Sequence, residues 1–525
     1  MDIWSWICEL PNSDEWNLFN SKLTFSLASS KNDDSNQSIN LRAERSTVGS
    51  DSELVSITFS VFYRGFRESS DVETTIWVSD PCPLTPNTPF LPLVLQLLQE
   101  IVSRAPTAHD STCPRSQLHN LKSDPVSWIL DSHSPQSFSN FFNLILLTRL
   151  FWLSVSDAPS EVGSFYFHSL LAPNLGSFSC KHAPVLKNFF ITVGSDVEIC
   201  FVRTFGYMLA KWLILREIEV GLKYFAPSNE LGFSYAMESH GLWVLKGFSP
   251  VSSMQCVQSR GQKSPFPAAV IDAKESLLKY ALAHQQLEAV IQIEYTVEFH
   301  DNFIQVNARL DNIRIHVVKL GFQNDSNEFL VDERHFPSRI RIWVGPEVGA
   351  SYVGGLSLGR STDNLEKEME MQKTLKGSSG KLKVPSKVKA MAKMATRTKI
   401  KNWRWDQDVE GNAAIFDAIL CDNATGVEVA TWKHPIGGHG GVNFRNRYSG
   451  GGRAFTKSGG LIFSGEECGG GVRWRLNREM EGSVLKWRIG GGIWLSYLPN
   501  DVMSMFYETR CVEWCDEVDL PLIPN

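Results

Sequence analysis

The basic residues of this chain are concentrated in one block. Between Lys373 and Arg404 the sequence contains eleven Lys or Arg residues and no Asp or Glu. Because the formal net charge of the chain is -6, the remainder carries -6 minus 11, or -17. Charge of one sign gathered in one segment attracts surfaces of the opposite sign. Lipid head groups, an acidic protein or a nucleic acid backbone would suit this block. The alternative interpretation is a linker that is either solvated or docked on the acidic remainder of its own chain.

A helix with a narrow apolar stripe is expected within the block, starting near Ser386. The stripe consists of Val388, Met391, Ala392 and Ala395, with Lys389, Lys393, Arg397 and Lys401 on the opposite side. Methionines suit an adaptable apolar contact, whereas base recognition would require more aromatic residues between the lysines. A membrane surface or an acidic protein is therefore favoured over nucleic acid. Trp403 and Trp405 could stack on bases or sit at a membrane interface, but strand packing is the commoner role of such residues.

A second basic group is expected on a hairpin within residues 471–492, with its turn between residues 478 and 483. Its apolar face comprises Val472, Trp474, Leu476, Leu485, Trp487 and Ile489. The opposite face is entirely basic, so it needs acids from a neighbouring strand or an external anion. The anion-binding residues predicted from both regions are Lys381, Lys383, Lys387, Lys389, Lys393, Arg397, Lys399, Lys401, Arg473, Arg475, Lys486 and Arg488.

No residue pattern predicts a catalytic, metal or cofactor site. Cys511 and Cys515 lack the two-residue gap of a zinc ribbon and are expected to be buried free thiols. His434 and His439 lie in a Gly-rich motif without an acid, which argues against a ligand pair. The Gly clusters of residues 437–492 precede strands rather than helices, so we interpret them as turns and not as phosphate-binding loops.

The elements that must position these groups are clearest in residues 288–318. Apolar and polar residues alternate on both sides of Asp301-Asn302, which predicts a hairpin with a two-residue turn. The expected cross-strand pairs are Phe299–Ile304, Val297–Val306, Tyr295–Ala308, Ile293–Leu310 and Glu294–Arg309. A third strand, containing Ile313, Ile315 and Val317, is expected after a further turn.

The N-terminal half shows mixed patterns. Residues 54–66 have strand composition and residues 88–104 have helical spacing, while residues 29–53 and 105–124 read as long polar loops. The apolar runs 141–155 and 207–215 are shorter than the roughly 20 residues of a membrane-spanning helix and predict buried helices. Residues 264–287 predict a loop that enters a helix ending near His284.

The cellular compartment is inferred from the N-terminus and the cysteines. Asp2 and Glu9 stand where a secretory signal would need a basic start and an apolar run, and ten Cys show no disulfide-like rhythm. We therefore expect a cytoplasmic or nuclear protein without a transmembrane segment, with peripheral attachment to a membrane as an alternative.

Together these patterns predict an α+β protein with a mixed N-terminal region containing buried helices, followed by antiparallel, sandwich-like β-sheets in the middle and C-terminal thirds. The expected regions are 1–265 (mixed), 266–360 (β-rich, opened by a helix), 361–402 (basic linker or insertion) and 403–525 (Gly-rich β), the last possibly forming one sandwich with 288–355. The expected function is non-catalytic binding of an anionic surface through the basic segment. Alternatives are an enzyme with a pocket between the helical and β regions, and a structural interaction subunit or nucleic-acid-binding protein.

Overall fold

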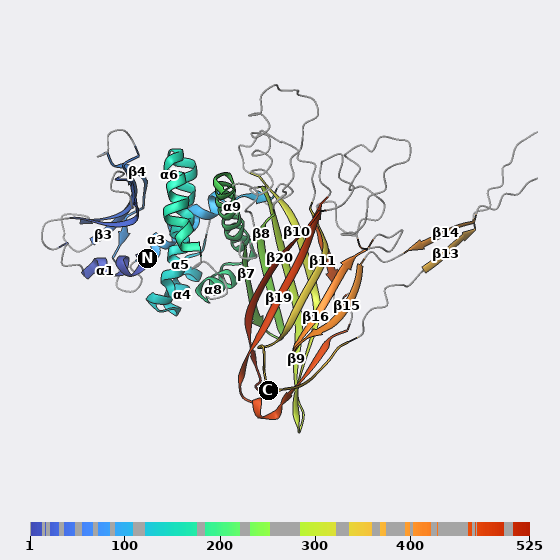
Figure 1. The fold of residues 1–525 in the computed structure, drawn as a ribbon. Helices are drawn as coiled ribbons and strands as arrows, with labels where there is room; N and C mark the ends of the chain where they lie inside the picture. Colours follow the sequence, from blue (N-terminus) through green and yellow to red (C-terminus); the bar gives the residue numbers. More distant parts are fainter. Residues whose placement is uncertain are drawn as a thin grey trace, which may run out of the picture.

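The computed structural model describes most of the 525-residue chain (Figure 1). The residues that it does not describe are 1, 13–15, 17–20, 31–35, 48–54, 67–71, 85–89, 109–120, 176–183, 221–231, 252–283, 322–334, 360–367, 374–393, 400–402, 422–427, 429–459, 465–467, 469, 498–507 and 525. The expected helix ending near His284 and the His434–His439 motif lie outside the described residues.

The N-terminal part combines a small antiparallel sheet with a layer of helices. The strands are β1 (Lys22–Ser29), β2 (Ser38–Thr47), β3 (Val55–Arg64), β4 (Thr74–Val78) and β5 (Cys82–Pro83), in the order β1-β2-β3-β4 with β5 beside β3. The helices are α1 (Ile3–Glu9), α3 (Leu91–Arg104), α4 (Ser123–Ser132), α5 (Pro135–Trp152), α6 (Ser160–Phe165), α7 (Ala172–Asn174), α8 (Pro184–Val193) and α9 (Ser195–Val220), with π-helical segments η3 (Leu153–Asp157) and η4 (Tyr166–Leu171). Strand β3 and helix α3 confirm two predictions, whereas β2 crosses a segment predicted to be a loop.

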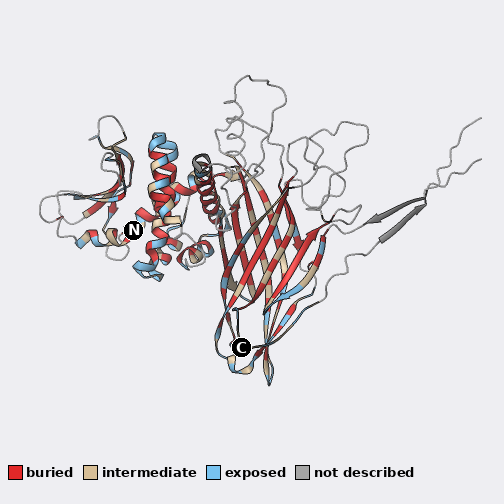
Figure 2. Cartoon of the chain, in the orientation of Figure 1, coloured by how far each residue is buried: buried red, intermediate tan, exposed pale blue. Residues whose placement is uncertain are grey.

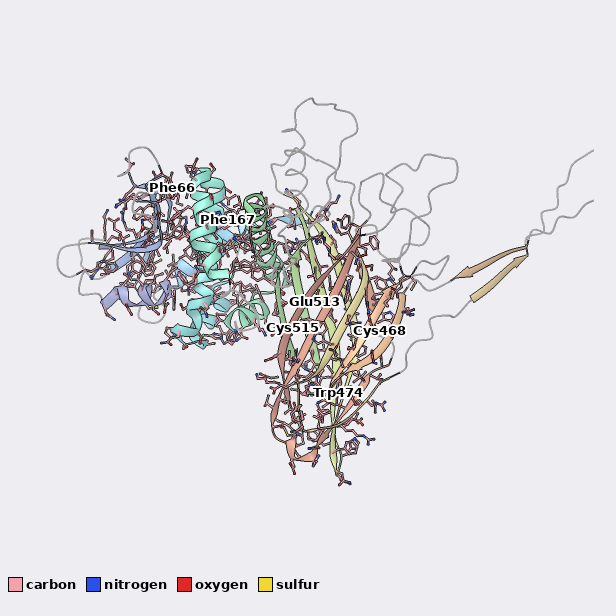
Figure 3. The ribbon with its side chains drawn as sticks, viewed as in Figure 1. Phe66, Phe167, Cys468, Trp474, Glu513 and Cys515 are labelled. Carbon is pink, nitrogen blue, oxygen red and sulfur yellow. The ribbon has the colours of Figure 1, made fainter. Side chains whose placement is uncertain are left out.

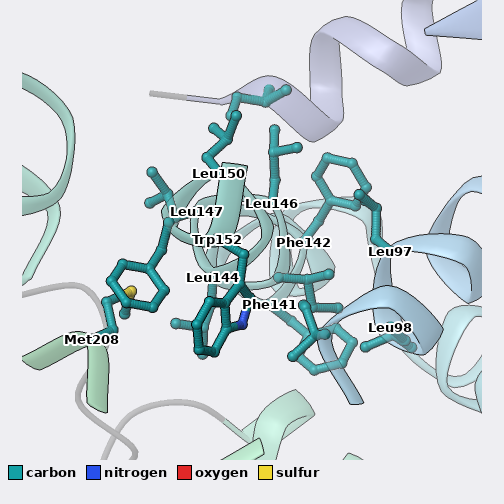
Figure 4. Packing of buried hydrophobic residues seen from close by; sticks show 14 of the residues in the cluster. Leu97, Leu98, Phe141, Phe142, Leu144, Leu146, Leu147, Leu150, Trp152 and Met208 are labelled. Atoms are coloured by element: carbon teal, nitrogen blue, oxygen red, sulfur yellow. The ribbon is translucent and has the colours of Figure 1, made fainter. Parts of the chain in front are cut away.

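Helix α5 is buried, as its composition predicts. Figure 4 shows Phe141, Phe142, Leu146 and Leu150 of this helix among apolar side chains from neighbouring helices. The helix together with η3, Pro135–Asp157, is long and apolar enough to cross a membrane, but 83% of its most apolar window is buried inside the protein. Its apolar surface is therefore already covered by the fold.

Two larger antiparallel sheets follow and face each other (Figures 1 and 2). The first contains β12 (Val353–Ser357), β18 (Val472–Asn477), β10 (Phe303–Gly321), β9 (Gln285–Phe299), β8 (Leu242–Pro250) and β7 (Phe233–Ser239) in that order, with β17 (Leu461–Ser464) and β6 (Thr107–Ala108) also beside β10. The second has the order β15 (Trp403–Glu410), β16 (Ala413–Leu420), β11 (Phe336–Pro346), β19 (Val484–Tyr497) and β20 (Glu508–Pro521). Both sheets contribute to one apolar interior, which makes the arrangement a sandwich. The α+β fold expected from the sequence is confirmed.

The predicted hairpin is present in the predicted register. Phe299 pairs with Ile304, Val297 with Val306, and Glu294 with Arg309. No separate third strand follows, because β10 continues to Gly321 through a bulge between Leu310 and Asn312. A bulge shifts the alternation of side chains between the two faces, as a turn would. The alternating pattern therefore predicted two strands where the structure has one long strand.

The predicted hairpin of residues 471–492 is wrong. Strand β18 pairs with β10 and β12, whereas β19 pairs with β11 and β20, so the two strands lie in different sheets. They are joined by the short 3-10 helix η11 (Arg478–Met480). Their apolar faces do meet, but across the interior, where the rings of Trp474 and Trp487 lie 5.2 Å apart. The alternation of apolar and polar residues determines which face of a strand is buried, but it does not determine which strand it pairs with.

Some glycines of the C-terminal region allow close packing rather than turns. Gly490, Gly491 and Gly492 lie inside strand β19. A Cβ at Gly490 would overlap the indole ring of Trp343 on the neighbouring strand β11. The interpretation of these three glycines as turns is therefore wrong, since at Gly490 a bare backbone makes room for a tryptophan.

Candidate functional site

The Lys-rich segment is only partly described. Lys381, Lys383, Lys387, Lys389, Lys393 and Lys401 lie outside the described residues. Arg397 and Lys399 belong to strand β14 (Met394–Lys399), which pairs with β13 (Glu368–Lys373). The register places Arg397 opposite Glu370 and Lys399 opposite Glu368.

This strand corrects the predicted helix of the block. Ala395, assigned to the helical stripe, lies in strand β14. The acids that precede the block and the bases near its end instead face each other across two paired strands. Six lysines of the segment belong to residues 374–393, which lie between these two strands in the sequence.

The end of the basic block is part of the sandwich. Arg404 forms ion pairs with Asp406 at 3.1 Å and with Glu428 at 3.6 Å. Trp403 and Trp405 are buried and pack edge-on against Phe463 of β17, at 5.3 and 5.0 Å between ring centroids. Both tryptophans thus have the strand-packing role, and neither is available to a nucleic acid or a membrane.

The four basic residues of the expected hairpin do not form one surface. Lys486 and Arg488 lie on β19, where Lys486 forms an ion pair with Asp519 and Arg488 stands opposite Glu517. The acids that this face requires therefore come from the neighbouring strand β20.

Arg473 and Arg475 project from β18, on the outer side of the other sheet, and are exposed. The guanidinium of Arg475 lies over the ring of Phe303, 5.1 Å from its centroid. Within the described residues, neither arginine forms an ion pair with an acid. Of the four residues, these two remain the better placed for an external anion.

A charged network on the five-stranded sheet was not predicted. Arg339 and Arg341 of β11 both donate to the carboxylate of Asp417 on β16, the latter at 2.8 Å. Burial of this carboxyl disfavours its ionised form, but the hydrogen bonds and charges of the two arginines outweigh that effect and lower the pKa of Asp417. The sequence gives no signal for this network, because it depends on which strands become neighbours.

Cys511 and Cys515 both belong to β20, where Cys511 donates through Sγ to Glu513 at 3.6 Å and Cys515 lies two positions beyond Glu513 (Figure 3 labels Glu513 and Cys515). Cys515 is exposed, so its predicted burial is wrong. Cys511 is partly buried, and this burial, with the charge of Glu513, raises its pKa to about 12. A thiol with such a pKa is a poor nucleophile and metal ligand at neutral pH. No group of three or more His, Cys, Asp or Glu residues suited to a metal occurs in the described part of the chain.

Polar side chains gather at the end of the sandwich opposite the β9–β10 turn. His335, which precedes β11, donates through Nδ1 to Oε1 of Gln285 at 2.9 Å, and its ring lies 4.6 Å from that of Tyr497. Arg510 of β20 pairs with Leu495 of β19, so these two side chains lie on the same face of the sheet. We call these four residues, Gln285, His335, Tyr497 and Arg510, the polar end of the sandwich. Sequence reasoning missed them because they come from three separate parts of the chain, and Gln285 and Arg510 lie more than 200 positions apart.

Comparisons with known proteins give no family. No protein-family model and no curated protein matches the sequence. Among solved structures, the chain resembles Clostridium perfringens delta-toxin (9% identity, 55% of this chain and 96% of that chain, TM-score 0.20). It also resembles the membrane-inserted form of the Clostridium perfringens NetB toxin (11%, 44% and 88%, TM-score 0.20) and a pore forming protein (10%, 54% and 94%, TM-score 0.18). TM-scores this low support no conclusion about fold or function.

Proposed function

We propose that this protein is a non-catalytic binding protein whose Lys-rich segment, residues 374–393, contacts an anionic partner at a membrane surface or on an acidic protein. The main observation that supports this proposal is the separation of positive and negative charge along the chain. This segment has six Lys and no Asp or Glu in twenty residues, and strands β13 and β14 flank it.

The distribution of the other cations supports this assignment. Lys486, Arg339 and Arg404 of the sandwich each have an acidic partner within the same protein. Arg397 and Lys399 stand opposite acids in the register of β13 and β14. An external anion would have to compete with those acids, whereas the sequence of residues 374–393 contains none. Each Lys near an anionic lipid surface adds roughly 1 kcal/mol of attraction at low salt.

Binding to anionic and neutral liposomes, polyglutamate and RNA would test the proposal at low and physiological salt. The test variant has Lys381, Lys383, Lys387 and Lys389 changed to Gln. A matched variant has Lys22, Lys122, Arg314 and Lys486 changed to Gln, which removes the same charge from exposed positions elsewhere. The expected result is binding to anionic liposomes or polyglutamate that the test variant weakens more than tenfold, while the matched variant stays close to the wild type.

Three outcomes would contradict the proposal. The first is that the wild-type protein binds none of the four probes, and the second is that the two variants lose the same amount of affinity. Preferential binding to RNA would assign the segment to nucleic acid instead. The steepness of the salt dependence separates charge-driven binding from apolar contact, because added salt makes counterion release less favourable and so weakens the charge-driven binding.

A further inference from the structure

The polar end differs from the rest of the sandwich interior. Further along the same strands, the inward-facing positions are apolar, including Ile291 and Ile293 on β9, Ile340 and Ile342 on β11, and Ile493 on β19. Polar groups at such positions are favourable only when they are hydrogen-bonded. The donors and acceptors at this end therefore need partners.

Among the described residues, the amide nitrogen of Gln285 and the Nε of Arg510 have no acceptor. Gln285 is 3% exposed, and its amide oxygen accepts from His335, which leaves its amide Nε2 without an acceptor in the described part of the chain. The Nε of Arg510 is also buried and has no acceptor in the described structure. Leaving a buried donor unpaired is costly, and more so when the group is charged.

The strand register brings these donors to the same end of the sandwich. His335 precedes Phe336, which pairs with Ser496, and the ring of His335 contacts Tyr497. Leu495, two positions before Tyr497 and on the same face of β19, pairs with Arg510. The hydrogen bond from His335 to Gln285 then connects this sheet to β9 of the facing sheet.

We propose that the polar end binds a small molecule with a carboxylate or phosphate group, held by the guanidinium of Arg510 and the amide Nε2 of Gln285. An oxyanion supplies several acceptor positions and the charge that Arg510 lacks among the described residues. Planar guanidinium groups match both carboxylate and phosphate geometry. The aromatic rings of Tyr497 and His335 would border the same ligand. This site uses no residue of the Lys-rich segment, so each proposal can fail without the other.

The shift of the melting temperature of the full chain with inorganic phosphate, succinate and glycerol would test this site, with NaCl added to equal ionic strength as the reference. A rise of about 2–4 °C or more with phosphate or succinate is expected at saturation, and none with glycerol. The anion that gives the larger shift identifies the preferred group. No shift with either anion overturns the proposal.

Single-residue variants test whether Gln285 and Arg510 cause the shift of the melting temperature. Gln285→Glu keeps the oxygen that accepts from His335 but replaces the Nε2 donor by a second carboxylate oxygen, so the response to anions should disappear. Arg510→Gln should also abolish it, whereas Arg314→Gln, which removes an exposed arginine of β10, should respond like the wild type. Direct titration calorimetry with phosphate and succinate gives the same comparison if a variant melts too early. A response that both Gln285→Glu and Arg510→Gln retain would overturn the assignment.

Discussion

Asp417 of β16 illustrates, at the scale of single residues, how one carboxylate can pair with two arginines of a neighbouring strand. It accepts from Arg339 and Arg341, and its pKa is lowered because these arginines outweigh the effect of burial. A folded-state pKa below the ordinary Asp value of about 3.9 means that the ionised carboxylate stabilises the fold. This stabilisation is fully present above that value and is lost as the pH falls through the folded-state pKa.

Asp417→Asn should therefore lower the free energy of unfolding at pH 7 by about 1–3 kcal/mol, because it removes charged hydrogen bonds to two arginines. The difference from the wild type should shrink as the pH falls below about 4, where the wild-type carboxylate also becomes neutral. Urea unfolding between pH 3 and pH 7 measures both quantities. Asp519→Asn, at the exposed pair with Lys486, should cost less than about 1 kcal/mol. A pH-independent effect at Asp417 would contradict the role of its charge.

At the scale of elements, the β9–β10 hairpin follows from local sequence. Its two-residue turn and its alternating pattern independently specify the same pairs, and the structure has those pairs. The burial of its apolar face is uneven, since Ile304, close to the turn, is fully buried while Val297, further from the turn on the other strand, is only half-buried. The stability of the hairpin should therefore depend most on the fully covered positions.

Ile304→Ala should cost about 2–5 kcal/mol, because it leaves a cavity between the facing sheets. Gln305→Ala, one residue further on the opposite face, should cost less than about 1 kcal/mol, since it removes one exposed hydrogen bond to Glu298. Thermal and urea unfolding of the two variants give this comparison directly. Equal losses would mean that the apolar face of the hairpin is not covered.

At the scale of the whole molecule, ion pairs between described residues join the helices to the sandwich. Lys187 of α8 reaches Asp516 of β20 at 2.7 Å, while Glu198 and Arg203 of α9 reach Lys246 of β8 at 2.8 Å and Glu288 of β9 at 2.7 Å. Asp516 also accepts from the backbone N–H of Ala236 at 2.6 Å, so it connects β20, β7 and α8. Burial, only partly offset by Lys187, raises the pKa of Asp516.

Lys187→Met should destabilise the protein by about 3–5 kcal/mol at pH 7, because it leaves the buried carboxylate of Asp516 without its cation. Combining it with Asp516→Asn should recover at least about 1 kcal/mol relative to the sum of the two single changes. Because the folded-state pKa of Asp516 is raised, acidification that protonates it should also reduce the loss caused by Lys187→Met. A double-mutant cycle at pH 7 and pH 5 measures both effects. Additive losses would indicate that the pair is not coupled.

The sequence by itself determined the features that depend on neighbouring residues. Periodicity identified helix α3, the buried helix α5 and the β9–β10 register, because turn geometry and burial act over short distances. The charge separation around residues 374–393 is also a property of composition alone.

Only the tertiary structure decided which strands face each other. Alternation predicted the buried faces of β18 and β19, but their placement in opposite sheets separates Arg473 and Arg475 from Lys486 and Arg488. The polar end likewise depends on strands that are distant in sequence, since the hydrogen bond from His335 to Gln285 joins the two sheets and the pairing of β19 with β20 places Arg510 at the same end. An alternating strand can pair with any complementary neighbour, so long-range pairing is settled by the packing of the whole interior rather than by local pattern.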